Sequence, residues 1–304
     1  MKSKKWILVL AACCITALCF TGCGQKTATN TTPIRIATKP MTEQYILGEI
    51  LGQLIENNTD YKVEITKGIK GGTSNIQPAM EKGEFDLYPE YTSSGWIMVL
   101  KHKAGEIEDD KMLAALQKEY EEKFNMTWIG LYGFNNTYCV TVDKTTADKY
   151  NVKKTSDLTA VADQLVIGVN PDYAEREDGL PALCKKYNIN FKEVKDVDIG
   201  LKYEALDSGS IQVTNGYTTD AQLATGKYVV LEDDQKLQVN YFASTIIRKE
   251  ALEAYPGLDK VLEKMDGILT DSEMAALNYK VEVEKQDEKE VAKAFLISKG
   301  LIKN

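Results

Sequence analysis

The hydrophobic pattern of the chain alternates between two periods after a polar N-terminal stretch. Residues 34–38 alternate apolar and polar positions as a strand does, and the following segment has apolar residues three and four apart, as on one face of a helix. Thr42 is the expected cap of that helix. A strand at 61–65, a helix near 75–82 and a short apolar run at 85–88 follow. This β-α-β-α-β order predicts a parallel sheet with helices on its faces.

The same alternation returns in a second block. Its predicted strands are 138–142, 164–169, 191–194 and 211–214, and its predicted helices are 155–162, 180–187 and 199–208. A strand at 242–247 and helices at 252–265, 271–281 and 288–299 complete the chain. We therefore expect two α/β lobes, residues 34–136 with 243–304 and residues 137–242, with hinge crossings near 138 and 241. Ligands of such sheets bind at the carboxyl ends of the strands, which predicts a cleft between the lobes.

The N-terminus predicts export. A basic start precedes an apolar run from Trp6 to Phe20 that is too short to span a bilayer, so residues 1–22 read as a signal peptide. The run ends in Phe20-Thr21-Gly22-Cys23, which resembles the lipobox of bacterial lipoproteins. A competing box at Cys13 would leave an apolar core of only about seven residues, so Cys23 is the preferred lipidation site. Residues 23–33 suit a flexible tether, and we expect the protein on the extracytoplasmic face of the bacterial cell membrane, held by lipid.

Tyrosine is the unusual component of the composition. The chain has 16 tyrosines against 7 phenylalanines and 1 histidine. Tyr91, Tyr138, Tyr217 and Tyr241 stand in polar, turn-like settings beside Pro, Asn or Gly, where a ring is presented at a site more often than it is packed in a core. Converging rings would form a cage for a cation that has no hydrogen-bond donors. The alternative for each ring taken singly is surface or half-buried packing.

Charge and missing motifs exclude several classes of protein. The net charge of −8 is spread over mixed Lys/Glu helix faces, which argues against a nucleic-acid partner. The sequence contains no dinucleotide, Walker or zinc motif, so we expect no cofactor and no metal. His102 has no acid or nucleophile beside it in the sequence, which argues against an enzyme. Cys139 and Cys184 are predicted to be free thiols rather than a disulfide, and the protein is expected to be a monomer.

A colinear series of motifs resembles one known family. The series comprises Lys39-Pro40-Met41-Thr42-Glu43-Gln44-Tyr45-Ile46-Leu47, Gly71-Gly72-Thr73, Gly83 to Thr92, Asn136-Thr137-Tyr138, Arg176-Glu177-Asp178-Gly179-Leu180, Ile199 to Tyr203 and Gly216 to Asp220. Any one of these motifs is weak, but the ordered series covers essentially the whole mature chain. It resembles the substrate-binding lipoproteins of osmoprotectant ABC importers, which take up glycine betaine, choline and carnitine.

The resemblance implies a two-lobed Venus-flytrap fold, the periplasmic binding protein type II fold, and a set of site residues. A quaternary ammonium would be held by a cage of Tyr91, Tyr138, Tyr217 and Tyr241. Lys39 and Arg176 stand where family members receive a ligand carboxylate. The alternatives are a solvated strand-end lysine for Lys39 and a salt bridge to Glu177 or Asp178 for Arg176. Where the family usually has Gly-Thr this chain has Ser93-Ser94, so Ser94 would supply the small polar contact there.

The resulting hypothesis is a binding protein that performs no chemistry. It would capture a quaternary ammonium osmoprotectant of the glycine betaine or carnitine class outside the cell and deliver it to an ABC permease. The alternatives are a choline- or ergothioneine-specific protein of the same family and a ligand-sensing module. An exported enzyme acting on small amines is disfavoured because no nucleophile and base stand together.

Overall fold

The computed structural model describes residues 32–175, 179–198 and 200–303. The signal peptide, Cys23 and most of the tether lie outside the described residues, and so does Arg176. Within them, no helix is both long and apolar enough to cross a membrane.

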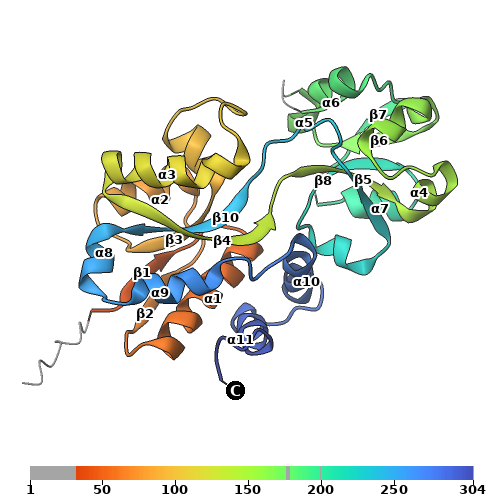
Figure 1. Cartoon of the computed structure of the whole chain (residues 1–304). Coiled ribbons are helices and arrows are strands. Elements are labelled where there is room, and N and C mark those ends of the chain that lie inside the picture. The colour runs from red at the N-terminus through yellow and green to blue at the C-terminus, as the bar shows by residue number, and fades with distance from the viewer. Residues whose placement is uncertain (1–31, 176–178, 199, 304) are drawn as a thin grey trace, which may run out of the picture.

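Two five-stranded mixed sheets organise the chain (Figure 1). The first has the order β2-β1-β3-β10-β4 and the second the order β7-β6-β8-β5-β9. The strands of the first sheet are β1 (Ile34–Ala37), β2 (Val63–Thr66), β3 (Leu87–Tyr91), β4 (Met126–Asn135) and β10 (Phe242–Arg248). Those of the second are β5 (Tyr138–Asp143), β6 (Val166–Val169), β7 (Glu193–Asp196), β8 (Val213–Tyr217) and β9 (Tyr228–Leu231). The predicted α/β class is confirmed.

The parallel pairing predicted for the first three strands is confirmed, because β1 pairs in parallel with β2 and with β3. One strand in each sheet runs in the opposite direction. β10 is antiparallel to β3 and β4, and β5 is antiparallel to β8 and β9. Both strands begin directly after a segment that connects the two sheets, so each enters its sheet from the other half of the molecule. The parallel strands of each sheet are joined through helices in the usual way. The antiparallel direction of β5 and β10 is set instead by the segments that bring the chain across from the other half.

Helices cover both faces of the sheets. The α-helices are α1 (Thr42–Asn58), α2 (Thr73–Glu81), α3 (Asp109–Phe124), α4 (Lys144–Tyr150), α5 (Pro171–Glu175), α6 (Leu180–Tyr187), α7 (Lys202–Asp207), α8 (Lys249–Ala254), α9 (Leu258–Leu262), α10 (Asp271–Glu282) and α11 (Glu288–Ser298). Short 3-10 helices are η2 (Thr155–Ala160), η3 (Ala162–Gln164), η4 (Ala221–Thr225) and η5 (Glu263–Met265), and η1 (Ser94–Val99) is a π-helix. The helix expected over 155–162 is thus two 3-10 pieces, because Val161 between them has a non-helical backbone.

The apolar stripe of α1 explains the core on one face of the first sheet. Ile46, Leu47, Ile50 and Leu54 are fully buried there, together with side chains of α9, α10 and α11. The opposite face is covered by α2, α3 and η1 in a separate cluster. Thr42 is the first helical residue of α1 rather than its cap; Met41 is the N-cap residue, and no side chain caps the helix.

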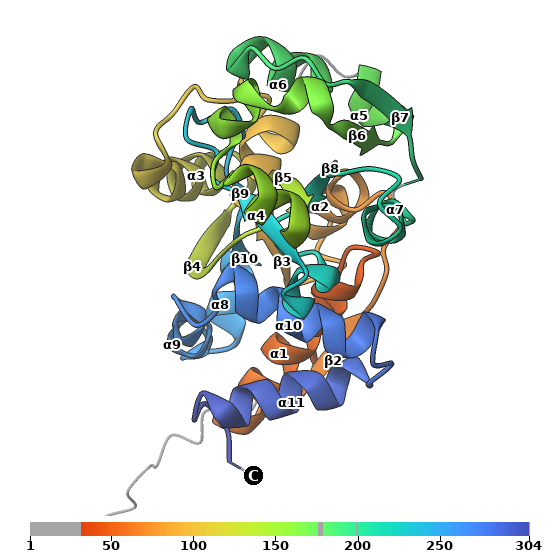
Figure 2. The same ribbon diagram turned by 90° about the vertical axis from the view of Figure 1, so that its right-hand side faces the viewer.

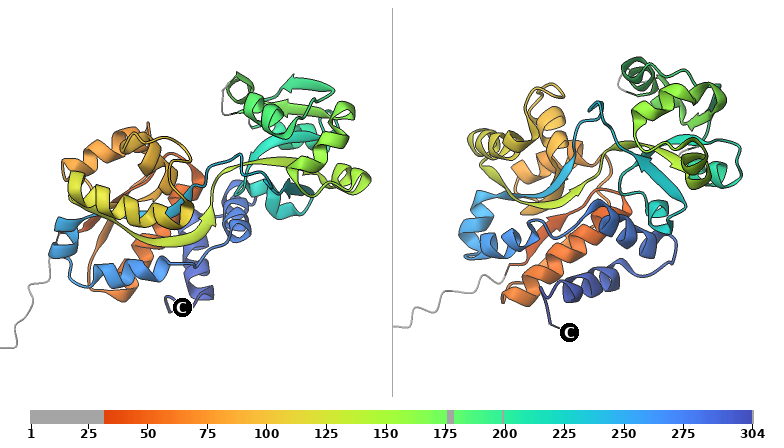
Figure 3. Two further views of the ribbon diagram at one scale, coloured as in Figure 1. Left: turned by 45° about the horizontal axis from the view of Figure 1, so that its top comes forward. Right: turned by 45° about the vertical axis from the view of Figure 1, so that its right-hand side comes forward.

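Two connecting segments run side by side between the sheets (Figure 3). One joins β4 to β5 and the other leads into β10, and the backbone N–H of Asn136 donates to the carbonyl of Tyr241 at 3.2 Å. A third connection is made by α10, which packs against α1 of the first half and η4 of the second (Figure 2). The helix therefore contacts both halves, although its sequence neighbours belong to the first.

Candidate functional site

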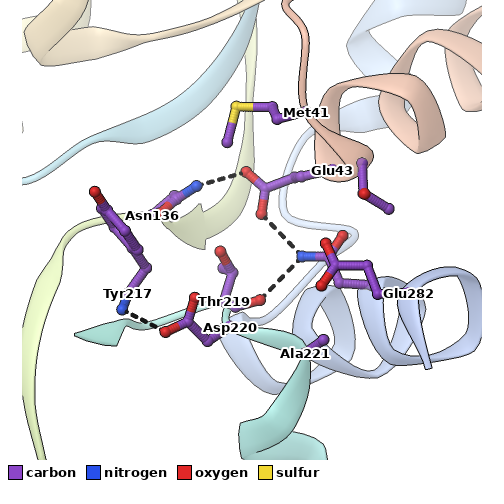
Figure 4. Close-up of a pocket in the computed structure, with 10 residues that line it drawn as sticks. Met41, Glu43, Asn136, Tyr217, Thr219, Asp220, Ala221 and Glu282 are labelled. Carbon is purple, nitrogen blue, oxygen red and sulfur yellow. Dashed lines mark hydrogen bonds between the residues drawn. The ribbon is translucent and has the colours of Figure 1, made fainter. Parts of the chain in front are cut away.

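A cavity of about 250 Å³ lies where the two halves and α10 meet (Figure 4). Its lining residues come from four segments: Met41, Thr42 and Glu43 at the start of α1, Asn136 in the first crossing, Tyr217, Thr219, Asp220 and Ala221 at and after the end of β8, and Asn278 and Glu282 on α10. β8 ends at Tyr217, so this wall of the cavity is built at the carboxyl end of a strand.

Glu43 is the buried acid of this cavity. Only 3% of the residue is exposed, and its carboxylate accepts hydrogen bonds from the Tyr91 hydroxyl and from Asn136 Nδ2, the latter at 2.9 Å. Burial raises the pKa of Glu43 above its ordinary value, and these hydrogen bonds oppose the rise. Tyr91 itself is almost fully buried, and burial raises its pKa as well.

Asn278 joins the two halves at the floor of the cavity. Its Nδ2 donates to the carbonyl of Thr219 at 2.9 Å and lies 3.4 Å from Glu43 Oε2. These two contacts put the amide nitrogen between the Glu43 carboxylate and the Thr219 carbonyl. α10 therefore ties the start of α1 to the loop after β8.

A row of tyrosine rings in the second half of the molecule reaches the cavity at Tyr217. Tyr138 and Tyr217 occupy paired positions on β5 and β8, and their rings stack with centroids 5.0 Å apart at 29°. Tyr173 extends the row, with its centroid 5.3 Å from that of Tyr138. Tyr173 follows the Asn170-Pro171 turn at the end of a predicted strand, the same signal that marked the other four, but its ring is buried in the core of the second half.

A buried lysine, Lys202, lies against the ring of Tyr217. Lys202 Nζ is 5.2 Å from the centroid of Tyr217 and 5.1 Å from that of Tyr203. It forms an ion pair with Asp220 at 2.6 Å. The same Asp220 oxygen accepts from the Tyr203 hydroxyl at 2.7 Å and from the backbone N–H of Tyr217 at 2.9 Å. Burial raises the pKa of Tyr203, and the charge of Asp220 adds to the rise.

The first half of the molecule repeats this arrangement around Lys39. Lys39 is buried and pairs with Glu90, and its Nζ lies 4.7 Å from the centroid of Tyr91. Glu90 also accepts from Thr73 Oγ1 at 2.7 Å and from the backbone N–H of Tyr91 at 2.6 Å. Lys39 is therefore not the solvated strand-end lysine of the alternative interpretation. A ligand carboxylate would have to compete with Glu90 for it.

The remaining predicted residues have different surroundings. Tyr241 is partly buried and packs against the core of the first sheet. Ser94 is buried as the first residue of the π-helix η1. Cys139 and Cys184 are free thiols. Among the described residues, no group of three or more His, Cys, Asp or Glu side chains is placed to hold a metal ion.

Comparison with known proteins agrees with this architecture. Residues 32–298 match the family model described as the substrate binding domain of ABC-type glycine betaine transport systems. A carnitine transport binding protein, OpuCC of Listeria monocytogenes, is 38% identical over 266 residues, covering 86% of this chain and 85% of its own. The ergothioneine transport permease/ergothioneine binding protein EgtU of Helicobacter pylori is 42% identical over 276 residues, or 91% of this chain. The chain spans about half (49%) of the length of EgtU.

A solved structure shows the same fold. A glycine betaine/carnitine/choline ABC transporter protein superposes with a TM-score of 0.83 at 31% identity, over 88% of this chain and 99% of the other. The predicted periplasmic binding protein type II fold and the predicted family are both confirmed, and the relatives are transport proteins rather than enzymes. The chain belongs to the family of substrate-binding domains of ABC-type glycine betaine transport systems.

Proposed function

We propose that this chain captures a quaternary ammonium compound of the glycine betaine or carnitine class between its two halves and delivers it to an ABC permease. The observation that carries the proposal is the stacked Tyr138–Tyr217 pair, because Tyr217 also lines the cavity between the halves. The site needs no chemistry beyond binding, since the ligand is released unchanged.

The physical fit lies in the chemistry of the ammonium group. A trimethylammonium spreads its charge over methyl groups and has no hydrogen-bond donor. Proteins therefore bind it mainly through the faces of aromatic rings, and each well-placed ring contributes roughly 0.5 to 2 kcal/mol of binding free energy. The carboxylate of Glu282, which is exposed, and that of Asp220, which is paired with Lys202, line the same cavity and favour a positive ligand there. Tyr91 connects to this cavity through its hydrogen bond to Glu43.

Several residue roles belong to this proposal. Tyr91, Tyr138, Tyr217 and Tyr241 form the cage, Lys39 and Arg176 receive a carboxylate, and Ser94 supplies a small polar contact. Lipidation of Cys23 holds the protein, as a monomer, on the extracytoplasmic face of the membrane. Closure of the two halves around the ligand presents the surface that the permease reads.

Ergothioneine is the second candidate ligand, because the relative from Helicobacter pylori is an ergothioneine binding protein. Choline is the third, and it differs from the others in lacking a carboxylate.

Calorimetric titration of the mature protein with glycine betaine, carnitine, choline and ergothioneine tests the proposal. We expect at least one of the four to bind with a dissociation constant in the micromolar range and to be recovered unchanged by mass spectrometry. Ergothioneine binding tenfold tighter than the other zwitterions would select the second candidate. If none of the four released heat or raised the melting temperature, the proposed function would be wrong.

A further inference from the structure

Lys202 places an internal cation at the ring that the proposed ligand would use. Its side chain is only 7% exposed, and its ammonium lies 5.2 Å from the centroid of Tyr217. That distance is within the range in which a ligand ammonium interacts with a ring. A quaternary ammonium bound at Tyr217 would therefore share that ring with a second positive charge.

The ammonium is held in place by Asp220. Asp220 Oδ2 accepts from Lys202, from the Tyr203 hydroxyl and from the backbone of Tyr217, at 2.6, 2.7 and 2.9 Å. The close approach of these groups to the backbone is possible because residue 216 is a glycine and has no side chain. A Cβ at that position would lie 3.2 Å from both Asp220 Oδ2 and the Tyr203 hydroxyl, and 2.8 Å from Thr141 Oγ1.

The pair is close to neutral as long as both members are present. Asp220 lines the cavity, whereas Lys202 does not, so the carboxylate is the member that a ligand reaches directly. Like charges that approach a shared ring in a poorly hydrated site repel each other. A ligand with a net charge of +1 has no charge of its own to offset this repulsion, whereas a zwitterion has a carboxylate that offsets part of it.

We propose that Lys202 is a specificity-determining residue that disfavours net cations such as choline relative to zwitterions such as glycine betaine. This inference rests on the proposed function, because it assumes that a quaternary ammonium binds at Tyr217. Lys202 weakens cation binding in two ways. Its ammonium already interacts with the Tyr217 ring and repels a second cation there, and it neutralises the charge of Asp220.

The test compares wild type with Lys202→Met by titration with choline, glycine betaine and 3,3-dimethylbutan-1-ol, the uncharged carbon analogue of choline. Methionine keeps the length and apolar stem of lysine while removing its charge. We expect the ratio of choline affinity to glycine betaine affinity to rise about tenfold in the variant, an amount in the range of one well-placed cation–ring contact. Binding of the uncharged alcohol should not change, which separates charge from packing.

Two further variants serve as controls. Lys149→Met removes another lysine that lies over a tyrosine ring. Lys149 is exposed on helix α4, 4.7 Å from the centroid of Tyr150, and its loss should leave the ratio unchanged. Lys202→Met combined with Asp220→Asn removes both charges and should give a smaller gain for choline than Lys202→Met alone. If Lys202→Met melts well below wild type, Lys202→Gln replaces it in the same comparison.

The outcomes separate this inference from the proposed function. A wild-type protein that binds neither choline nor any zwitterion contradicts both. A wild type that binds a zwitterion, with a Lys202 variant whose choline ratio is unchanged or lower, contradicts only the role of Lys202.

Discussion

Two groups of residues with the same chemistry occupy the two halves of the molecule. We call Lys39, Glu90 and Tyr91 the first lysine group, and Lys202, Asp220 and Tyr217 the second. In each group a lysine ammonium lies about 5 Å from a tyrosine ring, at 4.7 Å in the first and 5.2 Å in the second, and pairs with a carboxylate.

The two groups differ in their access to the cavity. The Glu90 side chain is 0% exposed, and the Tyr91 hydroxyl is held by Glu43. The Asp220 side chain is 18% exposed, Tyr217 is only half-buried, and both line the cavity. The carboxylate of the first group is therefore closed off from solvent, and that of the second faces a place where a ligand fits. Breaking the first should affect stability most, and breaking the second should affect binding most.

The largest effect is expected from Glu90→Gln. This change leaves the Lys39 ammonium buried without a counter-charge, and the loss of one partner from a buried ion pair costs about 3 kcal/mol or more. Asp220→Asn is the matched change in the second lysine group. The Lys202 side chain is 7% exposed against 11% for Lys39, but Asp220 is 18% exposed and Glu90 0%, so water reaches the second pair through Asp220 and the change should cost less. Urea unfolding of the two variants measures both free energies. Equal losses would show that the difference in burial does not govern these pairs.

Tyr217→Ala should mainly affect binding. We expect affinity for the amine that binds wild type best to fall roughly tenfold, the loss of one well-placed ring. The melting temperature of the ligand-free protein should stay nearly unchanged, because Tyr217 is half-buried at the end of its strand.

Tyr217→Phe is the control for the tyrosine. It keeps the ring face and should retain most of the affinity, since a ring face and not a hydroxyl is what attracts the ammonium. Calorimetry of both variants decides the point, and unaltered affinity in the alanine variant would remove this ring from the proposed cage.

The sequence alone could predict the α/β class and the order of elements, because long segments such as the apolar face of α1 have a clear period. It could not predict the antiparallel entry of β5 and β10. Strand direction at those places depends on where the chain returns from the other half, which local periodicity does not record. The break of the helix at Val161 was missed because the apolar spacing of the segment was followed, although Thr155, Ser156, Asp157, Thr159 and Val161 are weak helix formers.

The same distinction applies to the residues of the candidate site: local sequence marks some of them and not others. The Tyr138 and Tyr217 rings could be singled out, because each stands in a polar turn beside Asn or Gly. Glu43 could not, because a glutamate in the first turn of a helix is expected there for helix stability alone. Asn278 lies 235 residues from Glu43 in the chain. The sequence of its own helix does not distinguish it as a site residue. Contacts of this kind arise only when α10 packs across both halves.

The smallest expected effect concerns Glu43, which connects the first lysine group to the cavity through Tyr91. Burial holds the pKa of Glu43 above its ordinary value in the folded protein, whereas the unfolded chain titrates near 4.3. Between the ordinary and the raised pKa the folded state binds more protons than the unfolded state, so stability falls as pH rises through that interval. Below the ordinary pKa both states are protonated, and the contribution of Glu43 is fully present. Glu43→Gln does not titrate, so the stability of the variant relative to wild type should rise with pH across the same interval.

Glu282→Gln is the matched control for this pH dependence, because Glu282 lines the same cavity but is exposed. Urea unfolding of the three proteins from pH 4 to pH 8 gives the comparison. A stability difference between Glu43→Gln and wild type that stays constant with pH would show that the hydrogen bonds from Tyr91 and Asn136 balance burial at this carboxylate, and one that falls as pH rises would show that they outweigh it. In that event Glu43 would carry a full negative charge beside Tyr217 and Asp220, and the first lysine group would be coupled to the ligand cavity by charge as well as by its hydrogen bond.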